Sequence, residues 1–274
     1  MKKKFVIAAA VALIIISIVA YRYINGRDTD GLALSGTVEV TEVNVGFKVP
    51  GRVRTLFTDE GRAVNSGDKV AELDSAELES LVNQSSANVR NAEARQEKAR
   101  NDFERYTKLY KDEVVSPQQM DAAKTAYEEA ASQLQMYVAA LRTARVKLSD
   151  SVIYAPLNGI VLRKNVEQGE TVNTGTPVFT IGDMEHPWIK VYVKEDKLGF
   201  VKLGQKAEIT VDSFPGKKYE GTVSYISSEA EFTPKNVQTR EERVKLVFGV
   251  KVSVKNQGSE LKPGMPADVK IVIQ

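Results

Sequence analysis

One segment of the chain occurs twice, and this repeat constrains the fold more than any other feature. Residues 51–74 align without a gap onto residues 159–182, at the constant offset of 108 that separates Gly51 from Gly159. Recurring valines suit packed strands, and recurring glycines suit the turns between them. We predict turns at Gly51, Gly61, Gly67, Gly159, Gly169 and Gly175. Each copy is too small to bury a core alone, so the repeat predicts one β-sandwich built from two halves.

The sequence between the two copies has a different period. From residue 78 to 110, and again from 120 to 148, apolar residues recur at alternating steps of three and four, which indicates a coiled coil. Between these stretches, Ser116, Pro117 and Gln119 form a helix-capping signal. The pattern predicts an antiparallel helical hairpin over residues 75–150, with arms about 50 Å long.

The register of this hairpin follows from the position of its turn. Folding the chain near Glu113 predicts an aromatic residue opposite an alanine at two levels of the seam. The predicted pairs are Phe103 with Ala123 and Tyr127 with Ala99. Large side chains against small ones allow two helices to approach closely.

The N-terminus carries a candidate membrane anchor. Residues 5–21 are apolar except for Ser17, and lysines occupy positions 2–4. A helix of this length spans roughly 25 Å, the short end of what crosses a bilayer, and the lysines place its start in the cytoplasm. We predict a retained single-pass anchor over residues 1–23 in the bacterial inner membrane, with the bulk of the chain in the periplasm. A signal peptide cleaved after Ala20 is the alternative.

The C-terminal third has the pattern of short strands. Residues 184–274 contain alternating stretches separated by turn residues, which predicts a small antiparallel β-barrel. The chain has no cysteine and one histidine, His186, so clustered thiolate or imidazole metal ligands are excluded. Lysine and arginine (38) nearly balance aspartate and glutamate (36), which gives no sign of nucleic-acid binding. We predict no catalytic group, no metal, no cofactor and no enzyme activity.

The order of these segments resembles the HlyD-type membrane fusion proteins, the periplasmic adaptors of bacterial exporters. Three local sequences strengthen the likeness: KVPGRV at residues 48–53, YAPLNG at residues 154–159 and LKPGM at residues 261–265. The resemblance implies a mainly β fold with a long coiled-coil hairpin, in which a split lipoyl-like β-sandwich (a barrel-sandwich hybrid) occupies residues 33–74 and 151–183. The β-barrel and the N-terminal transmembrane helix complete the expected fold.

The resemblance also implies partners. Residues 230–237 (AEFTPKNV) look like those of adaptors that serve ABC-type exporters. Only a short stretch follows the predicted barrel strands, which leaves little room for a full membrane-proximal domain. This also favours an ABC-type inner-membrane transporter. Members of this family reach a TolC-like outer-membrane channel with the hairpin and commonly assemble as rings. We therefore expect efflux or secretion by a homo-oligomer of six copies.

The hairpin tip carries a candidate docking motif. Family members that dock onto TolC-type channels have arginine, leucine and serine near the tip at offsets of four and eleven, and Arg105, Leu109 and Ser116 have this spacing. Tyr106 and Tyr110 take the seam positions, so Arg105 and Leu109 are expected on an exposed flank. We predict that these three residues contact the channel, although helix capping alone also explains Ser116.

Two other functions fit parts of the sequence. A lipoyl or biotinyl carrier presents a modified lysine between its two halves. Residues 74–78 contain no lysine, and Lys69 and Lys147 only flank this connection. A passive envelope tether would use the hairpin as a spacer, and it needs neither a tip motif nor a paired transporter.

Overall fold

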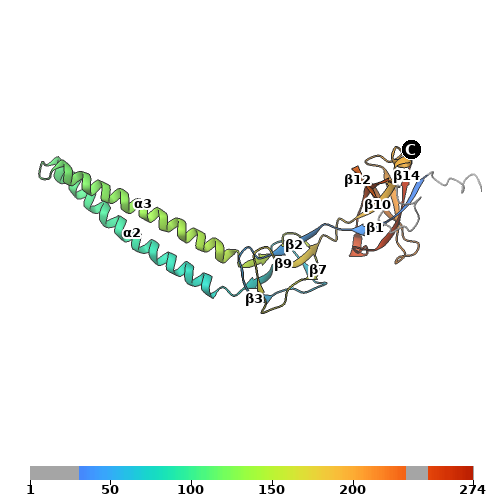
Figure 1. Cartoon of the computed structure of the whole chain (residues 1–274), viewed down its shortest axis with the longest axis horizontal. Coiled ribbons are helices and arrows are strands. Elements are labelled where there is room, and N and C mark those ends of the chain that lie inside the picture. The colour runs from blue at the N-terminus through green and yellow to red at the C-terminus, as the bar shows by residue number, and fades with distance from the viewer. Residues whose placement is uncertain (1–30, 233–245, 274) are drawn as a thin grey trace, which may run out of the picture. The chain divides into compact units, whose positions relative to one another are not determined.

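The computed structural model describes residues 31–232 and 246–273, which form two compact units (Figure 1). One unit is Glu42–Gly182, and the other combines the described residues before and after it. The predicted anchor over residues 1–23 lies outside the described residues, as do residues 233–237 of the AEFTPKNV sequence. Within the described ranges, no helix is both long enough and apolar enough to cross a bilayer.

The first unit contains a sandwich of two four-stranded sheets. The first half supplies β2 (Glu42–Gly46), β3 (Gly51–Leu56), β4 (Ala63–Val64) and β5 (Lys69–Leu73). The second half supplies β6 (Val152–Tyr154), β7 (Gly159–Lys164), β8 (Thr171–Val172) and β9 (Pro177–Gly182). The strand orders are β2-β9-β7-β4 and β6-β5-β3-β8, so each sheet takes two strands from each half.

The two halves are related by a pseudo-twofold exchange. Replacing each strand by its counterpart in the other half converts one sheet order into the other. Loop hydrogen bonds obey the same exchange: the Gly61 N–H donates to the Val161 carbonyl at 2.8 Å, and the Gly169 N–H donates to the Val53 carbonyl at 2.9 Å. The predicted two-half sandwich is therefore confirmed.

The sandwich core consists of the recurring apolar residues. Val70 and Val178 occupy the same position in the two halves, and both are fully buried. Phe47 and Phe179 are the largest buried side chains between the sheets. Because the core is shared between the halves, neither half has a complete apolar interior of its own.

The recurring glycines have two different roles. Gly61, Gly67, Gly169 and Gly175 have φ angles between 76° and 94°, a region that side chains disfavour. Gly51 and Gly159 instead begin strands β3 and β7, so the prediction that they form turns is wrong. At Gly159 the constraint is close packing, because an added Cβ would lie 2.3 Å from the carbonyl oxygen of Gly182.

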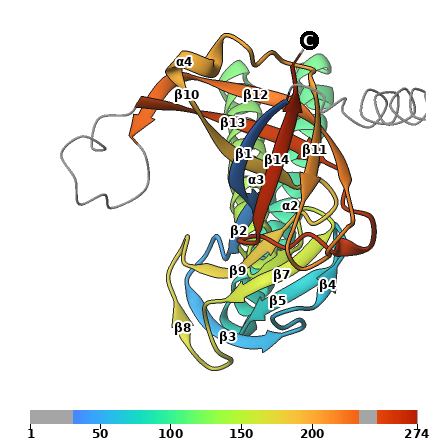
Figure 2. The ribbon, with the colours of Figure 1, turned by 90° about the vertical axis from the view of Figure 1, so that its right-hand side faces the viewer.

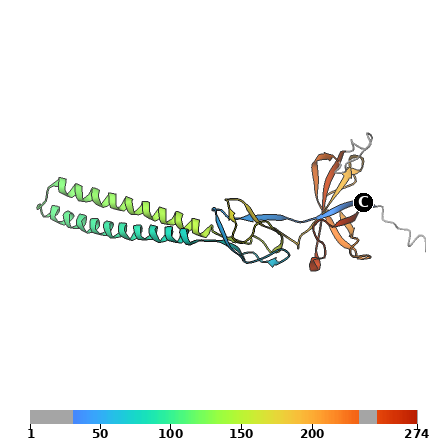
Figure 3. The ribbon, with the colours of Figure 1, turned by 60° about the horizontal axis from the view of Figure 1, so that its bottom comes forward.

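The hairpin consists of α2 (Ala76–Lys111) and α3 (Pro117–Ser149), which run side by side and antiparallel (Figures 1 and 3). Heptad positions are the protected ones, and Val89, Ala92, Leu141 and Ala144 are buried. The rings of Phe103 and Tyr127 stack nearly parallel, with their centroids 5.9 Å apart. The predicted register pairs Phe103 with Ala123 and does not include this contact. A seam residue also reaches the residue one turn away on the facing helix, and Tyr127 is one turn from Ala123.

The second unit is a closed six-stranded barrel (Figure 2). Its order is β1 (Gly31–Glu39), β10 (Trp188–Lys194), β13 (Leu246–Val254), β12 (Tyr219–Phe232), β11 (Lys206–Thr210) and β14 (Pro266–Val272). A one-turn helix, α4 (Glu195–Leu198), follows β10. Closure removes free strand edges and surrounds a core of valine and isoleucine side chains.

The N-terminal boundary of the sandwich differs from the prediction. The family resemblance implies that the sandwich begins at residue 33, but β1 belongs to the barrel. There it pairs with β14 along Gly31–Thr37 and with β10 along Gly36–Glu39. Without β1, the facing edges of β10 and β14 would be left unpaired, and the barrel would be open. The sandwich begins only at β2, after residue 41.

A buried asparagine fastens the loop that precedes β14. The Asn256 amide donates to the carbonyls of Met184 and Leu261, both at 2.8 Å, and its oxygen accepts from the Leu261 N–H at 2.9 Å. Asn256→Ala leaves these buried groups without partners, so we expect the barrel to lose about 2–4 kcal/mol of unfolding free energy. Thermal melting measures the loss. Asn83→Ala, the same substitution at an exposed position, serves as the control. Equal melting of the two variants would contradict this role.

Candidate functional site

The hairpin tip is closed by a backbone motif at the end of α2. The Val114 N–H donates to the Leu109 carbonyl at 2.9 Å, and the Glu113 N–H donates to the Tyr110 carbonyl at 3.1 Å. Glu113 has a φ of 60°, the left-handed conformation that completes a Schellman turn. Glycine usually occupies this position, so Glu113 is an uncommon residue for it. The turn therefore has a defined shape and presents the residues around it.

The apolar surface of the tip differs from the predicted one. Leu109, expected on the exposed flank, is half-buried, whereas Tyr110, expected in the seam, is 40% exposed. The seam has ended at this level because α3 begins only at Pro117. Val114 is 67% exposed and was not among the predicted site residues. Its sequence signal was the apolar pair Val114–Val115 in a turn, with polar residues on either side of the pair.

Arg105 lies on the exposed flank of α2, as its spacing predicted. Its guanidinium is within 3.4 Å of the Asp102 carboxylate; the Arg105 side chain is largely open to solvent, and that of Asp102 is partly exposed. Such an exposed pair is worth well under about 1 kcal/mol, so it leaves Arg105 available for another contact. The tip thus combines the cations of Arg105, Lys108 and Lys111 with apolar side chains at the turn.

Ser116 has a structural role that is complete in itself. Its hydroxyl accepts from the Gln119 N–H at 3.3 Å, and its own N–H donates to the Gln119 side chain at 3.0 Å. This reciprocal pair is the capping box that starts α3. The structure brings Arg105, Leu109 and Ser116 to the same end of the hairpin, and their contact with a channel remains a prediction.

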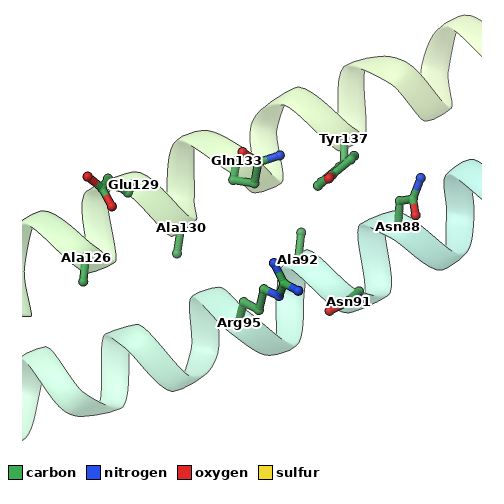
Figure 4. A pocket seen from close by; sticks show the side chains of 9 residues that line it. All are labelled: Asn88, Asn91, Ala92, Arg95, Ala126, Glu129, Ala130, Gln133 and Tyr137. Atoms are coloured by element: carbon green, nitrogen blue, oxygen red, sulfur yellow. The ribbon is translucent and has the colours of Figure 1, made fainter.

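A groove of about 310 Å³ lies on the flank of the hairpin, between α2 and α3. Figure 4 shows Ala92 of α2 pointing toward α3, and Ala126 and Ala130 of α3 pointing toward α2, so small side chains line the interior of the groove. Polar side chains surround it, among them Asn88, Asn91, Arg95, Glu129 and Gln133. The groove follows from the alanines in the seam, which leave space between the two backbones.

Two titratable side chains of the barrel unit, Tyr219 and His186, each lie next to a carboxylate. Burial and a 2.8 Å hydrogen bond to the Glu260 carboxylate raise the pKa of Tyr219 to about 12, so its phenol stays protonated and serves as a donor. His186 is exposed at a turn, where its Nδ1 lies 3.0 Å from Asp183. Among residues 31–232 and 246–273, no three metal-ligating side chains of the His, Cys, Asp or Glu type come together.

The carrier interpretation finds no support at the junction between sandwich and hairpin. β5 ends at Leu73 and α2 begins at Ala76, so the short turn that would carry a modified lysine is replaced by the helices. Lys69 lies within β5, where its ammonium pairs with Glu72, and Lys147 lies within α3. Neither lysine is at a turn that could present a swinging cofactor.

Comparisons with known proteins identify the family. Residues 41–183 match the family "CzcB-like, barrel-sandwich hybrid domain", and residues 187–274 match "CusB-like, beta-barrel domain". The fold is similar to that of the membrane fusion protein Spr0693 from Streptococcus pneumoniae R6, with a TM-score of 0.71 and 20% identity over 89% of this chain and 99% of that one. The chain belongs to the membrane fusion protein family. The expected fold of β-barrel, barrel-sandwich hybrid and hairpin is the fold of this family.

Named relatives agree with this membership. A UPF0194 membrane protein from Acidithiobacillus ferridurans is 32% identical, covering 98% of this chain and 96% of its own length. The UPF0194 membrane protein YbhG from Salmonella paratyphi B is 29% identical, covering 98% of each chain. A MacA–MexA chimera with the MexA hairpin from Pseudomonas aeruginosa has a TM-score of 0.63 and 26% identity, covering 89% of this membrane fusion protein and 81% of that chain.

Proposed function

We propose that this membrane fusion protein is the periplasmic adaptor of an ABC-type exporter and joins it to a TolC-like outer-membrane channel. The N-terminal segment over residues 1–23 anchors the chain in the inner membrane, and the sandwich and barrel contact the transporter. The protein works by assembly and carries no catalytic function of its own. Substrates leave by efflux or secretion through the conduit that the three components form.

The observation that carries this proposal is the tip of the hairpin. A turn of defined shape exposes Val114 and Tyr110 at the far end of the hairpin, on the arm that also carries the exposed cation of Arg105. Apolar residues exposed at a fixed turn are typical of a contact surface. The spacing of Arg105, Leu109 and Ser116, which resembles that of TolC-docking adaptors, supports a channel as the partner.

The flank groove supports the proposed hexamer. Alanines inside the groove would let a helix of a second copy approach closely, and the surrounding amides and charges could bond to its polar face. Hairpins packed in this way would form a bundle around a central path. Six copies is the expected number from the family resemblance.

A passive tether is the second candidate, because the hairpin alone would span distance. Cross-linking at the tip distinguishes the two functions. We expect a photo-reactive amino acid in place of Val114 to cross-link the outer-membrane channel in intact cells. The same group in place of the exposed Glu97, in the middle of α2, should give no such product. Equal yields from both positions, or none from either, would favour the tether.

The class of transporter is tested by affinity purification of the full chain from detergent-solubilised membranes. We expect a permease together with its ATPase subunit in stoichiometric amounts. Recovery of a proton-driven transporter in their place would overturn the ABC assignment and leave the adaptor function standing.

A further inference from the structure

A loop of the barrel exposes two large apolar side chains. Phe200 is 55% exposed and Leu203 is 66% exposed, and both lie between α4 and β11. Val201, between them in sequence, is buried in the barrel core. The loop therefore alternates between a residue that fixes it to the barrel and residues that project into solvent.

Hydrogen bonds hold this loop in one shape. The Gln205 amide donates to the Phe200 carbonyl at 3.0 Å, and its oxygen accepts from the Lys202 N–H at 2.8 Å. The Gly204 N–H donates to the Val223 carbonyl of β12 at 2.9 Å. Because the backbone is bonded on both sides of Leu203, the exposure of the apolar side chains is built into the loop.

Exposed lysines flank the two apolar residues along the chain. Lys194, Lys197, Lys202 and Lys206 are all exposed, and the same stretch contains only Glu195 and Asp196 as counter-charges. Exposed aromatic and aliphatic side chains bordered by lysines are the arrangement that binds the headgroup region of an anionic bilayer. The chemistry of the loop thus matches a lipid surface on both its apolar and its charged side.

The loop lies at the end of the barrel where the chain enters. β10 runs antiparallel to β1, so its last residue, Lys194, lies at the end where β1 begins. Ile271 pairs with Leu32 of β1 on one side and with Ala207 of β11 on the other. The loop between α4 and β11 is therefore on the same rim as Gly31, as Figure 2 shows for α4 and the start of β11.

The length of the preceding chain limits how far this rim can be from the membrane. Nine residues separate Tyr21, the end of the apolar stretch, from Gly31. Fully extended, they span at most roughly 30 Å. With the proposed anchor in the bilayer, Gly31, on the rim that carries Phe200 and Leu203, lies within roughly 30 Å of the outer surface of that membrane, so the rim can reach it.

We propose that the 199–205 loop is a second membrane contact, in which Phe200 and Leu203 enter the headgroup region of an anionic phospholipid leaflet and the four lysines bind lipid phosphates. The contact rests on the proposed anchor and orients the barrel on the membrane. A transporter surface is the competing partner. The positive charge and the short connection to the apolar segment favour lipid.

The test uses the full chain reconstituted in vesicles. Because the chain has no cysteine, Leu203→Cys accepts a single environment-sensitive fluorophore, and Lys262→Cys, on the loop at the opposite end of the barrel, accepts the control label. In vesicles of phosphatidylcholine with phosphatidylglycerol, we expect the label at 203 to shift to the blue and to be quenched by lipid-borne spin labels. The label at 262 should show neither change. Replacing Lys197, Lys202 and Lys206 by glutamine should lower the ratio of docked to undocked loop about fivefold per lysine.

Flotation of the vesicles reports on the anchor independently of the loop. A chain that floats while the label at 203 behaves like the label at 262 overturns the loop contact and leaves the anchor intact. A label at 203 that shifts only when the transporter is added to the vesicles assigns the loop to the transporter and also overturns the lipid contact. A chain that does not float overturns the anchor and, with it, the loop contact.

Discussion

We expect Val114→Asp to abolish export and to leave the melting temperature of the protein unchanged. Val114 is two-thirds exposed at the closed turn, so a charge there costs little in the free protein, about 0.5 kcal/mol or less. In a desolvated contact with the channel, the same carboxylate has no partner. Loss of a central contact of this kind costs about 2 kcal/mol or more, which is roughly thirtyfold in affinity. Export assays, thermal melting and tip cross-linking on the same variant measure the three effects.

The neighbouring residues make weaker probes, for reasons that the structure gives. Leu109→Asp should also stop export, but Leu109 is half-buried, so part of its effect will be loss of hairpin stability. Arg105→Asp reverses the exposed cation and should reduce export without altering melting. Thr125→Asp, at an exposed position of α3 away from the turn, is the control. Normal export by the Val114 and Arg105 variants would remove the tip from the mechanism and favour the tether.

We expect Gly159→Ala to destabilise the sandwich strongly and Gly51→Ala to be tolerated. The two glycines occupy the same position in the two halves, but their surroundings differ. A Cβ at Gly159 would lie 2.3 Å from the carbonyl oxygen of Gly182, so β7 and β9 must separate or shift. A Cβ at Gly51 would meet the Leu73 side chain at 3.0 Å, and a shift of that side chain by a few tenths of an ångström relieves the contact. We expect a cost of about 3 kcal/mol or more at Gly159 and about 1 kcal/mol at Gly51.

The comparison is made by thermal melting and by limited proteolysis of the purified chain. Because the two changes are the same substitution at the first residue of equivalent strands, the intrinsic preference of the backbone for glycine or alanine cancels between them. Similar melting of the two variants would show that the sandwich adjusts at Gly159, and the close approach of β7 and β9 would then carry no constraint.

Local patterns were enough to predict the parts of this fold that depend on local chemistry. The capping box at Ser116 could be predicted because its partners are three residues apart, and the protected seam of the hairpin because its apolar residues recur at heptad spacing. The two-half sandwich could be predicted because valines and glycines recur at equivalent positions of the two copies, and similar patterns form similar structures. Each of these signals lies within a short stretch of chain or in a direct comparison of two stretches.

Contacts between distant segments decided the rest. β1 belongs to the barrel because it pairs with β14, which lies more than two hundred residues later in the chain. No local pattern encodes that partner. The stacking of Phe103 on Tyr127 and the exposure of Tyr110 depend on where the two helices meet and where the seam ends. Residue identities and periods therefore determined which elements form, while strand partners, exposed side chains and close backbone approaches were set only when those elements packed together, because packing depends on the shape of both surfaces at once.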